Sequence, residues 1–352
     1  MAFKGGEIPC TVPGLNAGAS FWSKAILPRS ANRHGRRQSL SVRNSVKIDT
    51  SEGGGYIGGV RYQITHRTTY IYEGVVTVSH HLARLAPRFL PGQRCPWHVL
   101  EITPEPVGRS LHNDVYGNET AYFECEGAHG ELEVIARSLV EVTPMPKPDA
   151  ASTPAWETVR DAVSGDRLNP GTEAGAFRFT SPMVPLGEDF AHYARPDFTP
   201  GRPILEAAAA LMGRIHTEFD FNPRATDVAT PVSEVLRKKA GVCQDFAHLM
   251  LACLRSLGLP ARYVSGYLET RPPEGKDRLT GADASHAWVS VFCGEAAGWV
   301  DADPTNNLLP GERHITVAWG RDYSDVSPLR GVTLGAGGQR LSVAVDVVPE
   351  GE

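Results

Sequence analysis

The sequence GVCQDFAHLMLACLRSLGLP, residues 241–260, decides the fold prediction because it combines a buried-helix pattern with a cysteine at the helix start. Its apolar residues recur at the three-to-four spacing of a helix packed into a core. They are Phe246, Leu249, Met250, Cys253, Leu254 and Leu257. The pattern stops at Gly258. Residues 231–240 predict a short preceding helix ended by Gly241, so that the chain turns and presents Cys243 at a new helix start.

A cysteine in the first turn of a helix is a candidate nucleophile, because the free N–H groups and the helix dipole stabilise a thiolate. Such a nucleophile needs a base and a group that orients the base. Residues 283–293, DASHAWVSVFC, predict a loop and a strand that carries His286. Residues 298–306, GWVDADPTN, predict a second strand with Asp301 and Asp303 on one face. Strand alternation leaves both aspartates as candidates for orienting the histidine.

Other polar and sulfur-containing residues nearby have structural interpretations. His248 lies about 140° around the helix axis from Cys243, so it is a poor base and is predicted to be a buried hydrogen-bonding residue. Asp245, in the first turn, is predicted to cap the helix. Cys253 and Cys293 are predicted to be buried hydrophobic residues.

Four motifs carry a resemblance to a known family. The run GVCQDFAHL, the strand RYVSGYL, the tetrapeptide SHAW and a tryptophan four residues before the aspartate of DPT resemble the transglutaminase-like superfamily of papain-type thiol enzymes. More narrowly, VRYQITHRTTYIY and SHHLARLAPR are similar to the N-terminal β region of bacterial transglutaminase-like cysteine proteases, and GRDYSDVSPLRG is similar to their tail. The resemblance implies that Cys243 is the nucleophile, His286 the general base and acid, and Asp303 the orienting carboxylate.

Composition excludes several classes of function. The 352 residues suffice for two domains, and the formal net charge of -5 argues against a general nucleic-acid binder. No apolar run approaches the length of about 20 residues that spans a bilayer, so no membrane role is expected. The six cysteines are scattered without a CxxC pair, which favours a reducing, cytoplasmic location. Neither HExxH nor a glycine-rich phosphate loop is present, so no metal or cofactor is expected.

The chain divides into three parts. Residues 1–59 lack periodicity and are expected to be disordered or a misassigned start, with a targeting segment as the alternative. Residues 60–143 contain five alternating segments, which predict an antiparallel β-sandwich-like domain. Residues 144–352 are expected to form the catalytic core. The fold class is therefore α+β, with a papain-like, transglutaminase-like core whose helical half precedes a β-barrel half, and 314–319 and 341–348 are expected to complete the barrel.

The expected activity is thiol-dependent acyl transfer at an amide bond of a polypeptide or other amide substrate, most simply hydrolysis. Protein-glutamine transamidation uses the same triad and is the alternative. A non-catalytic scaffold that binds polypeptides is the alternative from another class, and peptide N-glycanase-like or arylamine acetyltransferase-like chemistry is a further one. The backbone N–H of Cys243 is the natural first oxyanion donor, with Gln244 and Trp288 among the candidates for the second. The sequence leaves the oligomeric state open.

Overall fold

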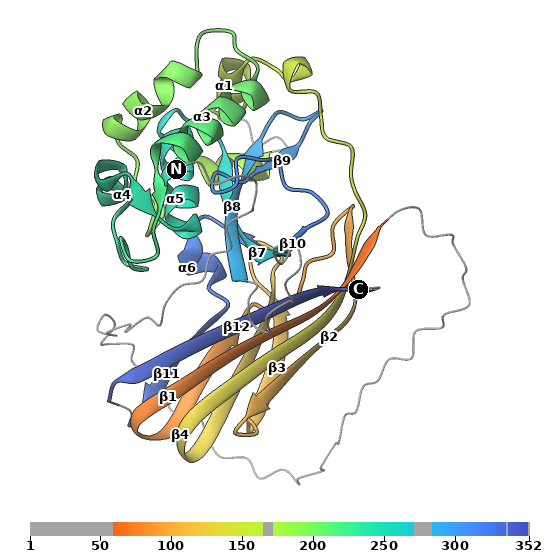
Figure 1. The fold of residues 1–352 in the computed structure, drawn as a ribbon, viewed down its shortest axis with the longest axis vertical. Helices are drawn as coiled ribbons and strands as arrows, with labels where there is room; N and C mark the ends of the chain where they lie inside the picture. Colours follow the sequence, from red (N-terminus) through yellow and green to blue (C-terminus); the bar gives the residue numbers. More distant parts are fainter. Residues whose placement is uncertain (1–58, 165–171, 271–283, 336, 351–352) are drawn as a thin grey trace, which may run out of the picture.

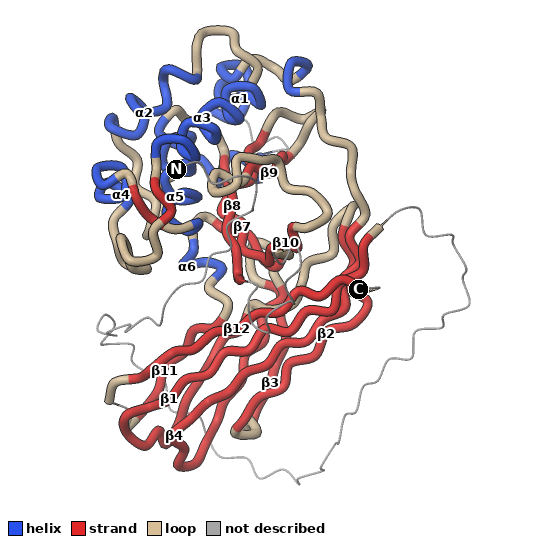
Figure 2. Tube along the Cα trace, viewed as in Figure 1, coloured by secondary structure: helices blue, strands red, loops and turns tan. Residues whose placement is uncertain are grey.

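The computed structural model describes residues 59–164, 172–270, 284–335 and 337–350, which form a mixed α and β fold (Figures 1 and 2). The segment 1–59, apart from Gly59, lies outside the described residues. The strands are β1 Val60–Ala83, β2 Gln93–Thr103, β3 Gly108–Asn113, β4 Glu119–Val142, β5 Asp220–Phe221, β6 Ala240–Gly241, β7 Ala261–Leu268, β8 Ala284–Phe292, β9 Trp299–Ala302, β10 His314–Gly320, β11 Leu329–Leu334 and β12 Gln339–Pro349. The α-helices are α1 Trp156–Ser164, α2 Glu188–Ala194, α3 Ile204–Glu218, α4 Val232–Lys238, α5 Cys243–Ser256 and α6 Tyr323–Val326.

The long strands β1 and β4 form the centre of a six-stranded antiparallel sheet. Each is one strand of 24 residues that spans two of the five alternating segments of the sequence, and their register shifts between Ile71 and Val78. Strands β12 and β11 pair with successive parts of β1, and β3 and β2 pair with successive parts of β4. The breaks in periodicity therefore mark irregularities within long strands, because a bulge interrupts the ladder without ending it.

The C-terminal strand β12 belongs to this first sheet, and the prediction that 341–348 completes the barrel of the core is wrong. β12 pairs with β1 over its whole length. Val345 and Val347 are buried in one apolar core with Tyr62 and Ile64 of β1. Alternation shows that a strand has a buried face, but it does not specify which sheet the strand joins.

The second sheet is antiparallel, in the order β10-β7-β8-β9, and follows the helices α1 to α5 in the chain. Figure 1 shows the helices α1 to α5 grouped at the opposite end of the molecule from the long strands of the first sheet. Helix α5 packs against β7, β8, α2, α3 and α4. Every residue from 243 to 255 is buried, so α5 is enclosed on all sides and not only along the predicted apolar stripe. Among the described residues, no helix is long and apolar enough to cross a bilayer.

Two amide side chains of the first sheet and its connections cover the open edge of β10. Gln93 donates to the carbonyl of Thr316 at 2.8 Å and accepts from the N–H of the same residue at 2.8 Å. Asn118 forms the equivalent pair with Trp319, at 2.8 and 3.0 Å. An edge strand presents unpaired backbone groups, and these amides satisfy them as a neighbouring strand would.

Replacing Gln93 with leucine is expected to lower the free energy of unfolding by about 1–3 kcal/mol, because the buried N–H of Thr316 loses its acceptor. Urea unfolding followed by circular dichroism measures this loss. Gln63→Leu, on the exposed face of β1, is the matched control and should change stability by less than about 0.5 kcal/mol. Equal urea midpoints for the two variants would show that the hydrogen bonds between Gln93 and Thr316 contribute nothing to stability.

Candidate functional site

The turn that leads into α5 begins with an unusual helix end. Helix α4 ends at Lys238 and is capped by Lys239, whose backbone is left-handed (φ 54°), and not by Gly241 as the sequence predicts. The Lys239 ammonium forms an ion pair with Glu218 and lies 4.6 Å from the ring centre of Phe219. These contacts favour a lysine in a conformation that glycine adopts more easily.

Gly241 is needed for space at the start of α5. A Cβ at this position would lie 2.6 Å from Oδ2 of Asp245. That oxygen accepts hydrogen bonds from the N–H of Val242 at 2.8 Å and the hydroxyl of Thr226 at 2.6 Å, so Asp245 caps the helix as predicted. Cys243 follows as the first residue of α5 and is 4% exposed. It lies where the positive end of the helix dipole favours an anion.

His286 and Asp303 form a buried hydrogen-bonded pair. Nε2 of His286 lies 2.7 Å from Oδ2 of Asp303, and both side chains are fully buried. Burial by itself raises the pKa of Asp303, but His286 and His314 outweigh it and hold the pKa well below its usual range. Asp303 is therefore a carboxylate at neutral pH and only accepts hydrogen bonds. His286 must donate from Nε2, which leaves the lone pair of the neutral ring on Nδ1.

That second nitrogen of His286 is the unusual feature of the site. Nδ1 is buried and has no hydrogen-bond partner among the described residues. Buried polar atoms without partners are uncommon and often mark a functional position. His286 lies on β8, which packs against α5, the helix that begins with Cys243 (Figure 1).

The structure separates the two candidate aspartates. Asp303 accepts from His286, whereas Oδ2 of Asp301 accepts from the indole N–H of Trp288 at 2.9 Å. Asp301 lies on β9 and Asp303 directly follows it, so the two carboxylates have different donors. Asp301 fixes the orientation of the tryptophan, whose ring centre lies 6.0 Å from that of His286.

Asp303 has further donors that the sequence analysis did not identify. Its Oδ1 accepts from the N–H groups of Thr305 and Asn306, at 2.9 and 3.2 Å. Its Oδ2 also accepts from the side-chain amide of Asn306 at 2.8 Å and from Nε2 of His314 at 3.1 Å. The sequence signal for His314 is a histidine at the start of a mostly apolar predicted strand, HITVAW.

His286, Asp303 and His314 are the cluster among the described residues whose composition could suit a metal ion. The Nε2 to Oδ2 distances of 2.7 and 3.1 Å are those of direct hydrogen bonds. A transition metal would instead lie about 2.0–2.2 Å from each ligand atom and between them. The geometry fits a hydrogen-bonded carboxylate, and we assign no metal to it.

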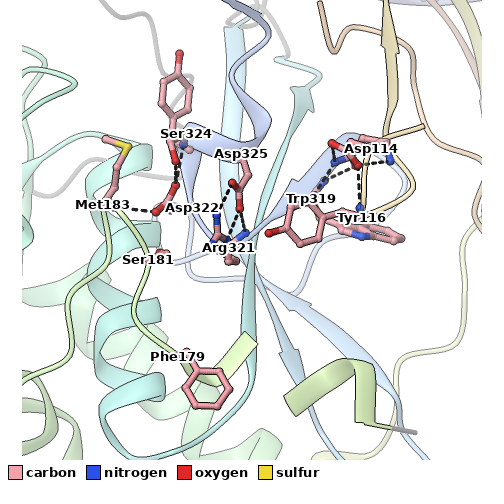
Figure 3. A network of polar contacts seen from close by, with 12 residues as sticks. Asp114, Tyr116, Phe179, Ser181, Met183, Trp319, Arg321, Asp322, Ser324 and Asp325 are labelled. Atoms are coloured by element: carbon pink, nitrogen blue, oxygen red, sulfur yellow. Dashed lines mark hydrogen bonds and ion pairs between the residues drawn. The ribbon is translucent and has the colours of Figure 1, made fainter. Parts of the chain in front are cut away.

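The segment after β10 is structural. Asp322 caps α6 by accepting from the N–H of Ser324 at 2.8 Å, and it also accepts from the N–H of Met183 at 2.8 Å (Figure 3). The N–H of Tyr323 donates to Nε2 of His248 at 3.2 Å. Burial lowers the pKa of His248 to about 4, so the ring stays neutral. His248 is thus a buried hydrogen-bonding residue, as predicted.

Known proteins match both sheets and the helical region. Residues 62–141 match the bacterial transglutaminase-like N-terminal region, and residues 192–304 match the transglutaminase-like superfamily. An uncharacterised protein of Mycobacterium tuberculosis is 44% identical over 299 residues, which cover 83% of this chain and 94% of the relative. The protein-glutamine gamma-glutamyltransferase of Pseudomonas aeruginosa is 33% identical over 106 residues, 29% of this chain and 16% of that protein.

A solved structure has the same fold. The crystal structure of a candidate cysteine protease from Cytophaga hutchinsonii superposes with a TM-score of 0.64 at 17% identity, covering 84% of this chain and 92% of that chain. At this identity the likeness concerns the fold alone. The two family matches and the mycobacterial relative, together with the shared fold, show that the chain belongs to the transglutaminase-like superfamily and carries the N-terminal region of its bacterial members.

Proposed function

We propose that the protein catalyses thiol-dependent acyl transfer at amide bonds, with Cys243 as nucleophile, His286 as general base and acid, and Asp303 as the orienting carboxylate. One observation carries the proposal. Nε2 of His286 is held by a buried carboxylate, while the buried Nδ1 lacks a partner among the described residues, on the strand that packs against the cysteine-bearing helix. This is the state in which a histidine can take a thiol proton.

Acylation follows from these roles. Nδ1 of His286 accepts the thiol proton, and the Cys243 sulfur forms a bond to the substrate carbonyl carbon. The carbonyl π electrons move to the oxygen, where the backbone N–H of Cys243 and the start of α5 stabilise the negative charge. The C–N bond then breaks, and the His286 imidazolium gives its proton to the leaving amine. The indole of Trp288, considered as a second oxyanion donor, already donates to Asp301.

Deacylation decides the product. In hydrolysis, His286 accepts a proton from water, the hydroxide adds to the thioester, and the Cys243 thiolate leaves with a carboxylic acid as product. In transamidation a primary amine replaces water and a new amide forms. We favour hydrolysis of a polypeptide or other amide, since nothing among the described residues identifies an amine site. Similarity to the Pseudomonas aeruginosa gamma-glutamyltransferase over 106 residues is what supports transamidation as the second candidate.

Alkylation by iodoacetamide tests the proposed pair without knowledge of the substrate. The full chain is reduced, freed of reductant and labelled at pH 6, where an ordinary thiol with a pKa of about 8.5 is only about 0.3% thiolate. Peptide mass spectrometry then gives a rate for each cysteine. Cys243 is expected to react about 100-fold faster than Cys95, whose thiol pKa burial raises to about 11.

His286→Ala should reduce the Cys243 rate about 100-fold and leave the Cys95 rate unchanged. If Cys243 reacts no faster than Cys95 in the wild type, or is indifferent to His286→Ala, the proposed pair is not assembled. A polypeptide-binding scaffold would then be the better description of the protein.

A further inference from the structure

We propose that His314 is a positioning residue for Asp303, and that one carboxylate oxygen held by two imidazoles keeps His286 in its reactive orientation. The inference deepens the proposed function and depends on it. It concerns a histidine outside the three residues to which that function assigns chemical roles.

The geometry joins the two edges of the second sheet. Asp303 directly follows β9, and His314 begins β10, while the strand order β10-β7-β8-β9 places these strands at opposite edges. Nε2 of His314 nevertheless lies 3.1 Å from Oδ2 of Asp303, and the two side chains are 3% and 0% exposed. A single buried hydrogen bond therefore connects residues that three strand pairings separate.

The shared oxygen fixes both rings. Oδ2 of Asp303 accepts from Nε2 of His286 and from Nε2 of His314, so both rings carry the proton on the same nitrogen. Backbone N–H groups hold Oδ1 on the opposite side of the carboxylate. The Trp288 ring centre lies 5.3 Å from that of His314 and 6.0 Å from that of His286. Rotation of the carboxylate away from His286 would thus break contacts on both of its oxygens.

The first sheet supports this arrangement from the other side of β10. Thr316, two residues after His314, is held by the amide of Gln93 through its N–H and its carbonyl. Without a fixed β10, His314 would have no fixed position relative to Asp303. The strand that carries the positioning residue is thus anchored by a buried side chain of the N-terminal region.

The test uses iodoacetamide labelling of Cys243 at pH 6 on the reduced full chain. His314→Leu removes the donor and should lower the rate about tenfold. His314→Gln, whose amide nitrogen is as many bonds from Cα as Nε2, keeps the donor and should stay within about threefold of the wild type. Should the leucine variant not fold, His314→Asn, with its amide one bond shorter, should show the same tenfold fall.

Two controls separate positioning from stability. His66, buried and hydrogen-bonded to Tyr267 and Thr68, provides the matched variant His66→Leu, which should leave the Cys243 rate unchanged. In an Asp303→Asn background, His314→Leu should cause no further loss, because its effect passes through Asp303. If His314→Leu lowers the Cys243 rate further in the Asp303→Asn background, or leaves the rate unchanged in the wild-type background, the inference is wrong.

The inference and the proposed function fail in different ways. If Cys243 is fast and dependent on His286 in the wild type but indifferent to His314→Leu, only the role of His314 is wrong. If Cys243 is slow in the wild type, the proposed function itself fails, and the role of His314 fails with it.

Discussion

Asp303→Asn is expected to lower the rate of Cys243 alkylation at pH 6 about 100-fold, close to the limit set by an ordinary thiol. The side chain of Asp303 accepts five hydrogen bonds, and an asparagine cannot accept them all. If its amide donates to Nε2 of His286, the ring proton moves to Nδ1, and no lone pair faces the thiol. The loss of negative charge also removes support for the imidazolium.

Asp301→Asn, two residues away in sequence, is the matched control. Its amide oxygen can still accept from the indole of Trp288, so the rate should stay within about threefold of the wild type. A larger loss of the labelling rate in Asp301→Asn than in Asp303→Asn would show that Asp301, and not Asp303, orients His286. Turnover of an amide substrate, once one is found, should fall by about 10²–10⁴-fold in Asp303→Asn.

Arg255→Met is expected to lower the free energy of unfolding by about 3–5 kcal/mol. Arg255 is 1% exposed and donates to the carbonyl of Ala261 at 3.0 and 2.8 Å and to that of Arg321 at 2.5 Å. It also donates to the carbonyl of Phe179 and the hydroxyl of Ser181, at 3.4 and 3.3 Å. Methionine fills similar space but leaves these acceptors buried and unsatisfied.

Burial lowers the pKa of Arg255 to about 10, so the guanidinium remains charged at neutral pH and all its donors are available. Urea unfolding gives the stability of the variant. Arg109→Met, at a half-exposed arginine paired with Glu105, is the control and should change stability by less than about 1 kcal/mol. If Arg255→Met is as stable as this control, the buried arginine does not hold the surrounding loops together.

Local patterns predicted the helix that begins with Cys243 and the candidate residues His286 and Asp303, because each pattern has a direct physical cause. The apolar spacing after Cys243 predicted the helix, which runs from residue 243 to 256. The alternation in SHAW and DADPT predicted that His286 and Asp303 lie on strands. His286 lies on β8, whereas Asp303 directly follows β9, and the two are hydrogen-bonded. The choice between Asp301 and Asp303 came from the family resemblance, because alternation places both on one face.

Some local features could not be predicted because they depend on side chains distant in sequence. Helix α4 is capped by Lys239 and not by Gly241, and the contacts of Lys239 with Glu218 and Phe219 favour its left-handed conformation. Gly241 instead provides space for the carboxylate of Asp245. A glycine at position 241 indicates either an unusual backbone conformation or a lack of space for a side chain, but the residue type alone does not distinguish the two.

The sequence by itself determined the helix that begins with Cys243 and the strand that carries His286, because helix and strand periodicity is local. Only the tertiary structure decided that β12 joins β1, that Gln93 covers the edge of β10, and that His314 shares the Asp303 oxygen with His286. Strand partners and buried hydrogen bonds are selected by the whole core, since any strand with one apolar face can join either sheet.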